Sequence, residues 1–424
     1  MKKTLFFALL IASGISVIAQ NNGNSTDQYR RSSIYSLIVN HTDQSYADHI
    51  RNQFLAIPVS DKYNDHNLSV RVVGVAFKPS KKEMDNNVQR FVSENHIASR
   101  LVGRWFDRDK QTGECNMNVV KARGLYDATE FDKEMASHST RGLAMLQDAG
   151  EDLIGNTYLI VNEVRYVDKG ATSKIVGTTL NVLTMTAGAV GAIALIAAGG
   201  DASTASDLMD LGKNTGQSLD DLASSLKGFR VKITTRLFQL NWNDTISNFF
   251  YSQCYSEKPD AVKKENFEKN RDKFTMRYLG KVVSKGNKTS FLGISEDEPL
   301  QMIRKATERA IDENVVDLQR KFPQFRVKSP ISDVVEAGGV VVKAPIGKKE
   351  GVDPMHKYEV LEVRESNGRI EYHKVGTVQP ISGLVWDNRF MAHEEGAEGA
   401  DLEATTFKVL SGSGFYPGML LREL

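Results

Sequence analysis

Cysteine is nearly absent from this chain, since its 424 residues include only Cys115 and Cys254. Two thiols are too few for a disulfide-dense scaffold or for a zinc site built from cysteine ligands. The chain also lacks a charge excess, with 54 Lys and Arg against 53 Asp and Glu. Proteins that bind nucleic acid normally present a clustered basic face, so we expect no nucleic acid among the partners.

The overall composition is that of a folded protein with more than one domain. A quarter of the residues are charged and 41% are hydrophobic, which argues against a disordered chain, a collagen-like repeat and a polytopic membrane protein. At roughly 100–200 residues per domain, the length predicts two or three domains, each large enough to bury a core.

Residues 1–19 have the pattern of a secretory signal peptide. Lys2 and Lys3 precede an apolar run over residues 5–18, and Ala19 places a small side chain before a cut at Gln20. The run is too short for a membrane-spanning anchor, which needs about 20 apolar residues. The sequence therefore predicts an exported protein of the periplasm or of the outer-membrane periphery.

Export to an oxidising compartment leaves two readings of the cysteines. Cys115 and Cys254 could pair, or they could be two buried, unreactive thiols. Spacing along the chain does not decide between these readings, because a disulfide needs its two Cα atoms within bonding range.

The hydrophobic pattern over residues 20–168 and 229–325 predicts an α/β domain with a mixed sheet, in a chain whose overall class is α+β. The expected elements, in order, are a short helix within residues 32–55, a strand over 68–77, a helix over 84–105, a strand over 115–125, a helix from residue 129 to about 150, a strand over 156–167, a strand over 229–242, a strand over 274–283 and a helix over 296–322. A polar region over residues 257–273 is expected to interrupt this series.

The strands over residues 156–167 and 229–242 are expected to pair. In the second strand, Val231, Ile233 and Leu237 share one face, while Lys232 and Arg236 occupy the other. This alternation is typical of a strand with one buried face.

Residues 326–424 predict a separate small all-β module, similar to an SH3-like barrel or sheet. Short turn-bounded apolar runs occupy this region, at residues 340–342, 358–364, 369–378, 383–386, 407–410 and 419–422. Asn367 and Gly368 lie between two of these runs, and this dipeptide is a strong signal for a two-residue hairpin turn.

Residues 169–228 are expected to be an insert between the two paired strands. Within it, residues 175–198 carry no charge and are long enough to span a bilayer, although Gly, Ala, Thr and Asn181 moderate their hydrophobicity. A single span would place the paired strands on opposite sides of a membrane. Asp207 and Asp210 make the returning segment costly in hydrocarbon. The sequence therefore predicts a helical hairpin that projects from the sheet.

Three readings of this hairpin stay open. The uncharged helix can be sheltered by the leucine-rich helix that follows it, it can self-associate or contact a membrane, or it can span the bilayer. Small residues four apart permit close helix approach. The candidate membrane or self-association residues are Leu180, Leu183, Ala187, Gly188, Gly191, Ala192 and Leu195.

Candidate catalytic and metal-binding patterns are weak. Asp107, Asp109, Gln111 and Gly113 alternate as in a calcium loop, but the glycine and glutamate that an EF-hand needs are replaced, so a solvated turn is expected. His393 begins an acidic loop with Glu394 and Glu395, without the spacing of a zinc-binding helix. We therefore expect no catalytic site, no cofactor and no metal.

Several short stretches resemble envelope proteins of the curli-secretion (CsgG) type and their relatives with a TolB amino-terminal-like domain. The similar stretches are residues 70–77 with the helix that follows, residues 118–126, and residues 149–161 together with 229–241. This resemblance implies an α/β domain and an assembly role at the cell envelope. No cysteine follows the apolar run of the signal peptide, so the lipid anchor of that family is not expected here.

The C-terminal region resembles the small β module that ends FlgT-like flagellar-envelope proteins. The resemblance lies in residues 351–360, 375–378 and 417–420. Together these features predict a non-enzymatic exported envelope protein with a scaffolding, assembly or secretion-associated role. Its expected partners are copies of itself or other envelope proteins, with membrane contact through residues 175–198.

The alternative is a secreted hydrolase that acts on envelope or carbohydrate substrates, with carboxylates far apart in sequence but about 5–10 Å apart in the fold.

Overall fold

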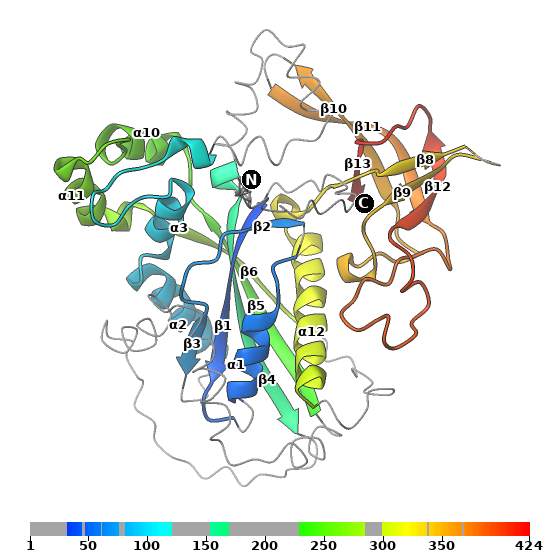
Figure 1. The fold of residues 1–424 in the computed structure, drawn as a ribbon, viewed down its shortest axis with the longest axis horizontal. Helices are drawn as coiled ribbons and strands as arrows, with labels where there is room; N and C mark the ends of the chain where they lie inside the picture. The colour runs from blue at the N-terminus through cyan, green and yellow to red at the C-terminus, as the bar shows by residue number, and fades with distance from the viewer. Residues whose placement is uncertain are drawn as a thin grey trace, which may run out of the picture.

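The structure is a computed structural model that describes residues 32–44, 47–60, 62–75, 81–120, 153–168, 229–284, 299–336, 339–366 and 369–424. Two sheets organise these residues, one with six strands and one with seven. A long helix, α12 (Pro299–Lys321), stands between them (Figure 1). The chain is α+β, as the sequence predicts. In the described part of the chain, no helix combines the length and the apolar character needed to cross a membrane.

The six-stranded sheet is mixed. Its order is β2-β1-β4-β5-β6, with β3 also paired to β1. The strands are β1 (Ser32–His41), β2 (Tyr63–Asp65), β3 (Val72–Val75), β4 (Thr157–Asp168), β5 (Phe229–Leu240) and β6 (Met276–Val283). Strand β1 runs parallel to β2, β3 and β4, whereas β4–β5 and β5–β6 are antiparallel.

The prediction of a short helix within residues 32–55 is wrong for its first half. Residues 32–41 form β1, an internal strand, and the helix α1 (Ala47–Ala56) begins only after it. Eight of the ten residues of β1 are buried, on both faces of the sheet. A strand buried on both faces lacks the polar–apolar alternation by which strands are recognised.

The helix predicted over residues 84–105 is present, but it is broken in two. Helices α2 (Lys81–Glu94) and α3 (Ile97–Trp105) meet at His96, whose φ of 47° and ψ of 42° are left-handed. Met84 and Leu101, one from each helix, pack into the same apolar cluster against β1, β4 and β5. The apolar face that the sequence predicts therefore continues across both helices. The break at His96 leaves no trace in the spacing of the apolar residues.

The strand predicted over residues 115–125 is also wrong in its described part. Residues 117–120 are helical, and the backbone N–H of Asn118 donates to Asn116 Oδ1 at 3.0 Å. An asparagine side chain that accepts from the backbone two residues later favours a turn over an extended strand. The remaining residues of this prediction, and the helix predicted from residue 129, lie outside the described ranges.

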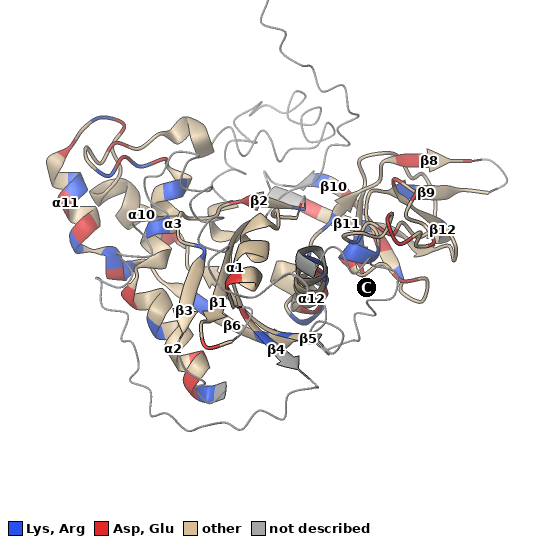
Figure 2. Ribbon diagram, turned by 60° about the horizontal axis from the view of Figure 1, so that its bottom comes forward, with Lys and Arg blue, Asp and Glu red and all other residues tan. Residues whose placement is uncertain are grey.

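The region predicted as a polar interruption contains regular structure. Helix α10 (Asp244–Gln253) precedes it and α11 (Ala261–Lys269) lies within it, followed by the short 3-10 helix η1 (Arg271–Lys273). Phe250 of α10 and Phe267 of α11 are buried together beside Trp105 of α3. Charged residues of both signs alternate along the outside of α11 (Figure 2), which explains why its helical periodicity is weak.

The predicted pairing of the two central strands is confirmed. Strands β4 and β5 are antiparallel from Tyr158 opposite Gln239 to Asp168 opposite Phe229. Residues 169–228 therefore leave the sheet and return to it at one end of a single hairpin, whatever their own structure. The predicted strand over residues 274–283 is present as β6, with a bulge opposite Leu237 and Phe238.

Helix α12 confirms the helix predicted over residues 296–322. Ile303, Ala306 and Leu318 are buried against the six-stranded sheet. In the same interface, Asn314 Nδ2 donates to Ile233 O at 3.0 Å and to Thr235 Oγ1 at 2.8 Å. The short 3-10 helix η2 (Pro323–Phe325) follows, because proline cannot continue the α-helical hydrogen-bond series.

The C-terminal region forms the all-β module that the sequence predicts. Its antiparallel strands are β7 (Ser329–Pro330), β8 (Asp333–Val335), β9 (Val341–Ala344), β10 (Tyr358–Ser366), β11 (Arg369–Pro380), β12 (Thr405–Gly412) and β13 (Leu420–Glu423), in the order β7-β13-β10-β11-β12-β9-β8. Strands β10 and β11 pair as far as Ser366 opposite Arg369, so the predicted hairpin forms, although its turn residues lie outside the described ranges.

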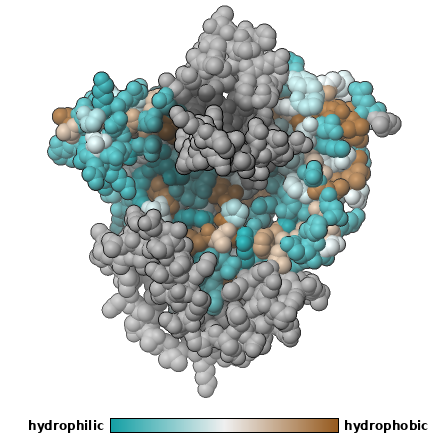
Figure 3. All heavy atoms as spheres, viewed as in Figure 1, coloured by the Kyte–Doolittle hydropathy of each residue, from teal (hydrophilic) through white to brown (hydrophobic). Residues whose placement is uncertain are grey.

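One strand predicted in the module is absent. Residues 383–386 form a turn and irregular backbone, although Val385 is buried in the core of the module. The outer edge of the module exposes Val340 and Leu410. Figure 3 shows hydrophobic surface there, where β8, β9 and β12 lie.

Candidate functional site

The association residues predicted from the sequence lie outside the described ranges. All seven, from Leu180 to Leu195, belong to the segment between β4 and β5. The structure does locate the two ends of this segment, because Asp168 and Phe229 are register partners. Any surface that the segment carries is therefore anchored at the end of the β4–β5 hairpin.

The loop that superficially resembles a calcium loop is a closed turn. Asp109 Oδ1 accepts hydrogen bonds from the backbone N–H groups of Gln111 and Thr112, at 2.7 and 2.6 Å, and from the Thr112 hydroxyl at 3.1 Å. These hydrogen bonds lower the pKa of Asp109. The carboxylate is thus directed at its own loop, as an Asx turn requires. Among the described residues, no group of three or more His, Cys, Asp and Glu side chains could hold a metal ion.

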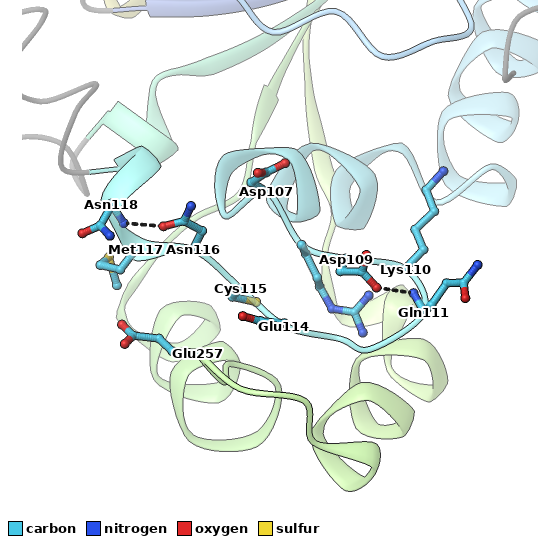
Figure 4. A pocket seen from close by; sticks show the side chains of 11 residues that line it. Asp107, Asp109, Lys110, Gln111, Glu114, Cys115, Asn116, Met117, Asn118 and Glu257 are labelled. Carbon is cyan, nitrogen blue, oxygen red and sulfur yellow. Dashed lines mark hydrogen bonds between the residues drawn. The ribbon is translucent and has the colours of Figure 1, made fainter. Parts of the chain in front are cut away.

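A shallow polar pocket of about 840 Å³ opens beside this loop (Figure 4). Four carboxylates line it, from Asp107, Asp109, Glu114 and Glu257. Glu257 accepts a hydrogen bond from the Tyr255 hydroxyl at 2.6 Å, and Asp109 serves its turn. Two of the four carboxylates therefore act as internal hydrogen-bond acceptors, which is a structural role and not that of a poised general acid.

Both cysteines are buried free thiols, and Cys115 is among the residues that line this pocket. Both belong to the apolar cluster around Phe106 and Phe250, and the backbone N–H of Cys115 donates to Ser256 O at 2.7 Å. Burial raises the pKa of Cys115, and it raises that of Cys254 to about 11. Because the thiolate is the reactive form, this environment makes both thiols poor nucleophiles.

A buried ionic cluster joins α2 to the six-stranded sheet. Arg236 of β5 is 1% exposed. Its Nε donates to Asp85 Oδ1 of α2 at 2.7 Å and its Nη2 donates to Glu163 Oε2 of β4 at 3.0 Å. Lys281 of β6 also pairs with Asp85, and His41 Nε2 of β1 lies 3.2 Å from Glu163 Oε1. One guanidinium thus holds two carboxylates from two different elements.

The electrostatics of this cluster keep Glu163 ionised. Burial by itself raises its pKa, but the His41 hydrogen bond and the charges of Arg236 and Arg165 outweigh burial and lower the pKa to about 2. The pKa of Asp85 is lowered in the same way, because its hydrogen bonds with Lys281 and Arg236 outweigh desolvation. Each carboxylate is already paired with cationic side chains of the chain itself. The cluster therefore has a structural role and is not an open binding site.

A second set of charged residues joins α12 to the module. Lys305, whose side chain is fully buried, pairs with Glu395, and Arg309 Nη2 lies 2.9 Å from Glu395 Oε2. Arg309 also donates to Phe390 O at 2.7 Å. Burial and the neighbouring Arg309 lower the pKa of Lys305 to about 8.

Glu395 belongs to the acidic loop that begins at His393. His393, the first residue of that motif, is indeed exposed and lies 3.1 Å from the equally exposed Asp401. Glu395, two residues later, instead faces α12, which is about ninety residues away in sequence. No local pattern distinguishes Glu395 from Glu394, so the sequence carried no signal for this contact.

Comparison with known proteins yields no relative from which to transfer a function. No protein-family model matches the chain, and no curated protein matches it.

Proposed function

We propose that this chain is an exported, non-enzymatic protein of the cell envelope with a scaffolding, assembly or secretion-associated role. In this proposal the folded body holds a segment that mediates self-association, binding to other envelope proteins or contact with a membrane. The observation that carries the proposal is the register of the β4–β5 hairpin, in which Asp168 lies opposite Phe229.

This register supports the proposal through topology. Residues 175–198 contain no charge, and such a run is costly to leave in water unless it is covered. Because the segment starts and ends at neighbouring strand positions, it can be held outside the sheet without disturbing it. A single membrane crossing within the segment would separate β4 from β5, which are paired from Tyr158 opposite Gln239 to Asp168 opposite Phe229.

The rest of the body supports a scaffold because α12 contacts both sheets. Helix α12 packs its apolar side on the first sheet through Ile303 and Leu318. Its charged side reaches the module through Lys305 and Arg309. An exposed apolar edge that includes Val340 and Leu410 offers a further contact surface on the module.

The decisive experiment removes the segment without breaking the hairpin. Residues 169–228 are replaced by Asn-Gly, a two-residue turn that suits antiparallel strands whose last partners are Asp168 and Phe229. Size exclusion with light scattering and flotation with liposomes compare this variant with the protein that retains the segment. We expect the intact protein to form oligomers or to float with vesicles, and the variant to be a monomer that does neither.

A matched control separates the apolar surface from the mere presence of the segment. The double variant Leu183→Lys, Leu195→Lys keeps the length but introduces charge into the uncharged run. We expect it to behave like the deletion. If all three proteins are monomers that ignore liposomes, the association role is rejected.

Export is tested separately by cell fractionation. We expect the chain in the envelope or periplasmic fraction, shortened at its N-terminus by about 19 residues, and carbonate washing distinguishes peripheral from integral attachment. Recovery of the uncut chain in the cytoplasm would contradict this part of the proposal.

A further inference from the structure

A small cavity lies between the α2–α3 corner and the edge of the six-stranded sheet. Its volume is about 190 Å³. Its apolar wall includes Phe238 of β5, Tyr278 of β6 and Ile97 of α3. The rings of Phe238 and Tyr278 are 5.0 Å apart and inclined by 44°. An apolar cavity of about 150 Å³ suffices to bind benzene, so this cavity has room for a planar compound of one or two rings.

The polar side of the cavity is formed by His96, Asp272 and Ser93. His96 Nδ1 lies 3.2 Å from Asp272 Oδ1 and makes no regular hydrogen bond within the described part of the chain. An acidic neighbour at this distance favours a proton on Nδ1, which leaves Nε2 as an acceptor. An apolar wall with a few polar groups is the usual composition of a small-molecule site.

The backbone at His96 gives an independent reason to consider this residue functional. Its φ of 47° places it in the left-handed region, where a helix break normally uses glycine or asparagine. The backbone N–H of His96 donates to Ser93 O at 2.9 Å and its carbonyl accepts from Arg100 N at 3.2 Å. These contacts are made by the main chain, so the turn itself does not require an imidazole.

We propose that this cavity binds a small planar aromatic compound that carries an N–H or O–H donor, and that His96 accepts its hydrogen bond. The aromatic wall holds the ring, and the imidazole selects compounds with a donor. This site is separate from the association role proposed above, since it is built only from α2, α3, β5, β6 and the η1 region.

The test measures the binding of indole and, for comparison, of 1-methylindole, which lacks the N–H donor. Isothermal titration and saturation-transfer NMR on the full chain should show saturable indole binding, with Kd of roughly 0.1–1 mM for so small a ligand. We expect 1-methylindole to bind about fivefold more weakly, the effect of one lost hydrogen bond.

Two variants identify the site. His96→Gly suits the left-handed backbone, so we expect unchanged or higher thermal stability. Its indole affinity should fall about fivefold, and it should no longer distinguish indole from 1-methylindole. Ser93→Trp, at an exposed position on the rim of the cavity, should block both probes.

The matched control is Met391→Gly. Met391 has a φ of 61° in a loop of the module, so the substitution makes the same backbone change away from the cavity. We expect it to bind both probes as the unsubstituted protein does. Absence of saturable indole binding, or indole binding that survives Ser93→Trp, overturns the site. Equal affinity of the unsubstituted and His96→Gly proteins for indole overturns the role of His96.

Discussion

The two sheets of this protein both bury apolar clusters, but they differ in where their buried charges lie. On its α2 side, the six-stranded sheet buries Arg236 between Asp85 and Glu163. The core of the seven-stranded sheet is an apolar cluster that includes Phe407 and Val360, and the module uses buried ion pairs where it meets α12. The first sheet therefore combines apolar clusters on both faces with a buried ionic cluster beneath α2, whereas the core cluster of the second sheet is apolar.

The buried ion pairs of this protein lie where two elements pack together, and they favour one relative position of those elements. Arg236 binds a helix and a neighbouring strand at once, and it satisfies them only when α2 lies in one position over the sheet. Glu395 does the same between the module and α12. An ion pair adds little stability compared with well-packed apolar groups, but breaking one leaves an uncompensated buried charge.

Among the proposed substitutions, we expect the largest effect from Phe407→Ala in the apolar core of the seven-stranded sheet. Phe407 is fully buried, and its ring centroid is 5.3 Å from that of Tyr358. We expect a loss of about 4 kcal/mol in the free energy of unfolding, because removal of a buried aromatic ring leaves a cavity. Urea denaturation at pH 4 and pH 7 should give similar losses, since no charge is involved. The neighbouring exposed Lys408→Ala is the control, with a change of about 0.5 kcal/mol or less.

The corresponding change in the buried ionic cluster of the six-stranded sheet is Arg236→Met. It leaves Asp85 and Glu163 without their shared cation, so we expect a loss of about 3 kcal/mol at pH 7. In the unsubstituted protein the pKa of Glu163 is lowered to about 2, so its stabilising effect is present above its ordinary pKa and is lost as the pH falls from about 4.5 to about 2. The cost of the substitution should therefore shrink over that range, as measured by urea denaturation. A cost that stays constant with pH would mean that Arg236 acts through packing alone.

Asp312 of α12 lies between the two sheets, and it should make the free energy of unfolding depend on pH with a sign opposite to that of Glu163. Burial, with Glu308 and Glu350 nearby, raises the pKa of Asp312 to about 7. The residue keeps some exposure overall, but its Oδ2 atom is inaccessible and has no hydrogen-bond partner among the residues that the structure describes. The native state keeps this proton up to about pH 7 while the unfolded chain releases it near pH 4, so stability falls as the pH rises between these values.

Asp312→Asn should remove that dependence. We expect the variant to be more stable by about 2 kcal/mol at pH 8 and unchanged at pH 4, as measured by thermal unfolding across the range. Asp333→Asn, at an exposed position on β8, serves as the control and should show no such trend. If the difference in stability between the variant and the unsubstituted protein is the same at pH 4 and pH 8, Asp312 is not the source of the pH dependence.

The smallest effect is expected at the solvent-exposed rim of the boundary. Arg320 pairs with Glu423 at 2.9 Å, and both side chains are partly exposed. Arg320→Gln should cost about 0.5 kcal/mol and should lose its effect in high salt, as exposed ion pairs do. A double-mutant cycle with Glu423→Gln measures this coupling. A coupling of several kcal/mol would show that the rim, and not the buried Lys305–Glu395 pair, holds the module in place.

Local sequence patterns predicted several elements correctly. The β4–β5 pairing, β6, α12 and the hairpin formed by β10 and β11 follow from runs of β-branched residues, alternation, helical spacing and turn residues, although β4 is buried on both faces over residues 157–164. Two failures have different physical causes. Strand β1 is buried on both faces and so lacks the alternation of a half-exposed strand, whereas residues 115–119 alternate in sequence, but residues 117–120 follow an asparagine turn and are helical.

The candidate sites divide in the same way. The turn at Asp109 was expected because its residue types act within three positions of one another. The cavity at His96 was not expected, because its wall combines residues from β5 and β6 with a helix break more than a hundred residues earlier. Only the fold brings such residues together.

By itself, the sequence of this protein determined the β4–β5 pair, β6, α12 and the β10–β11 hairpin, and it determined that the uncharged run lies between two paired strands. The tertiary structure alone decided that β1 lies inside the sheet, that Arg236 joins two carboxylates, and that Glu395 leaves its acidic loop for α12. The physical reason is range: periodicity and turn chemistry act over a few residues, whereas burial and ion pairing depend on contacts that only the folded chain creates.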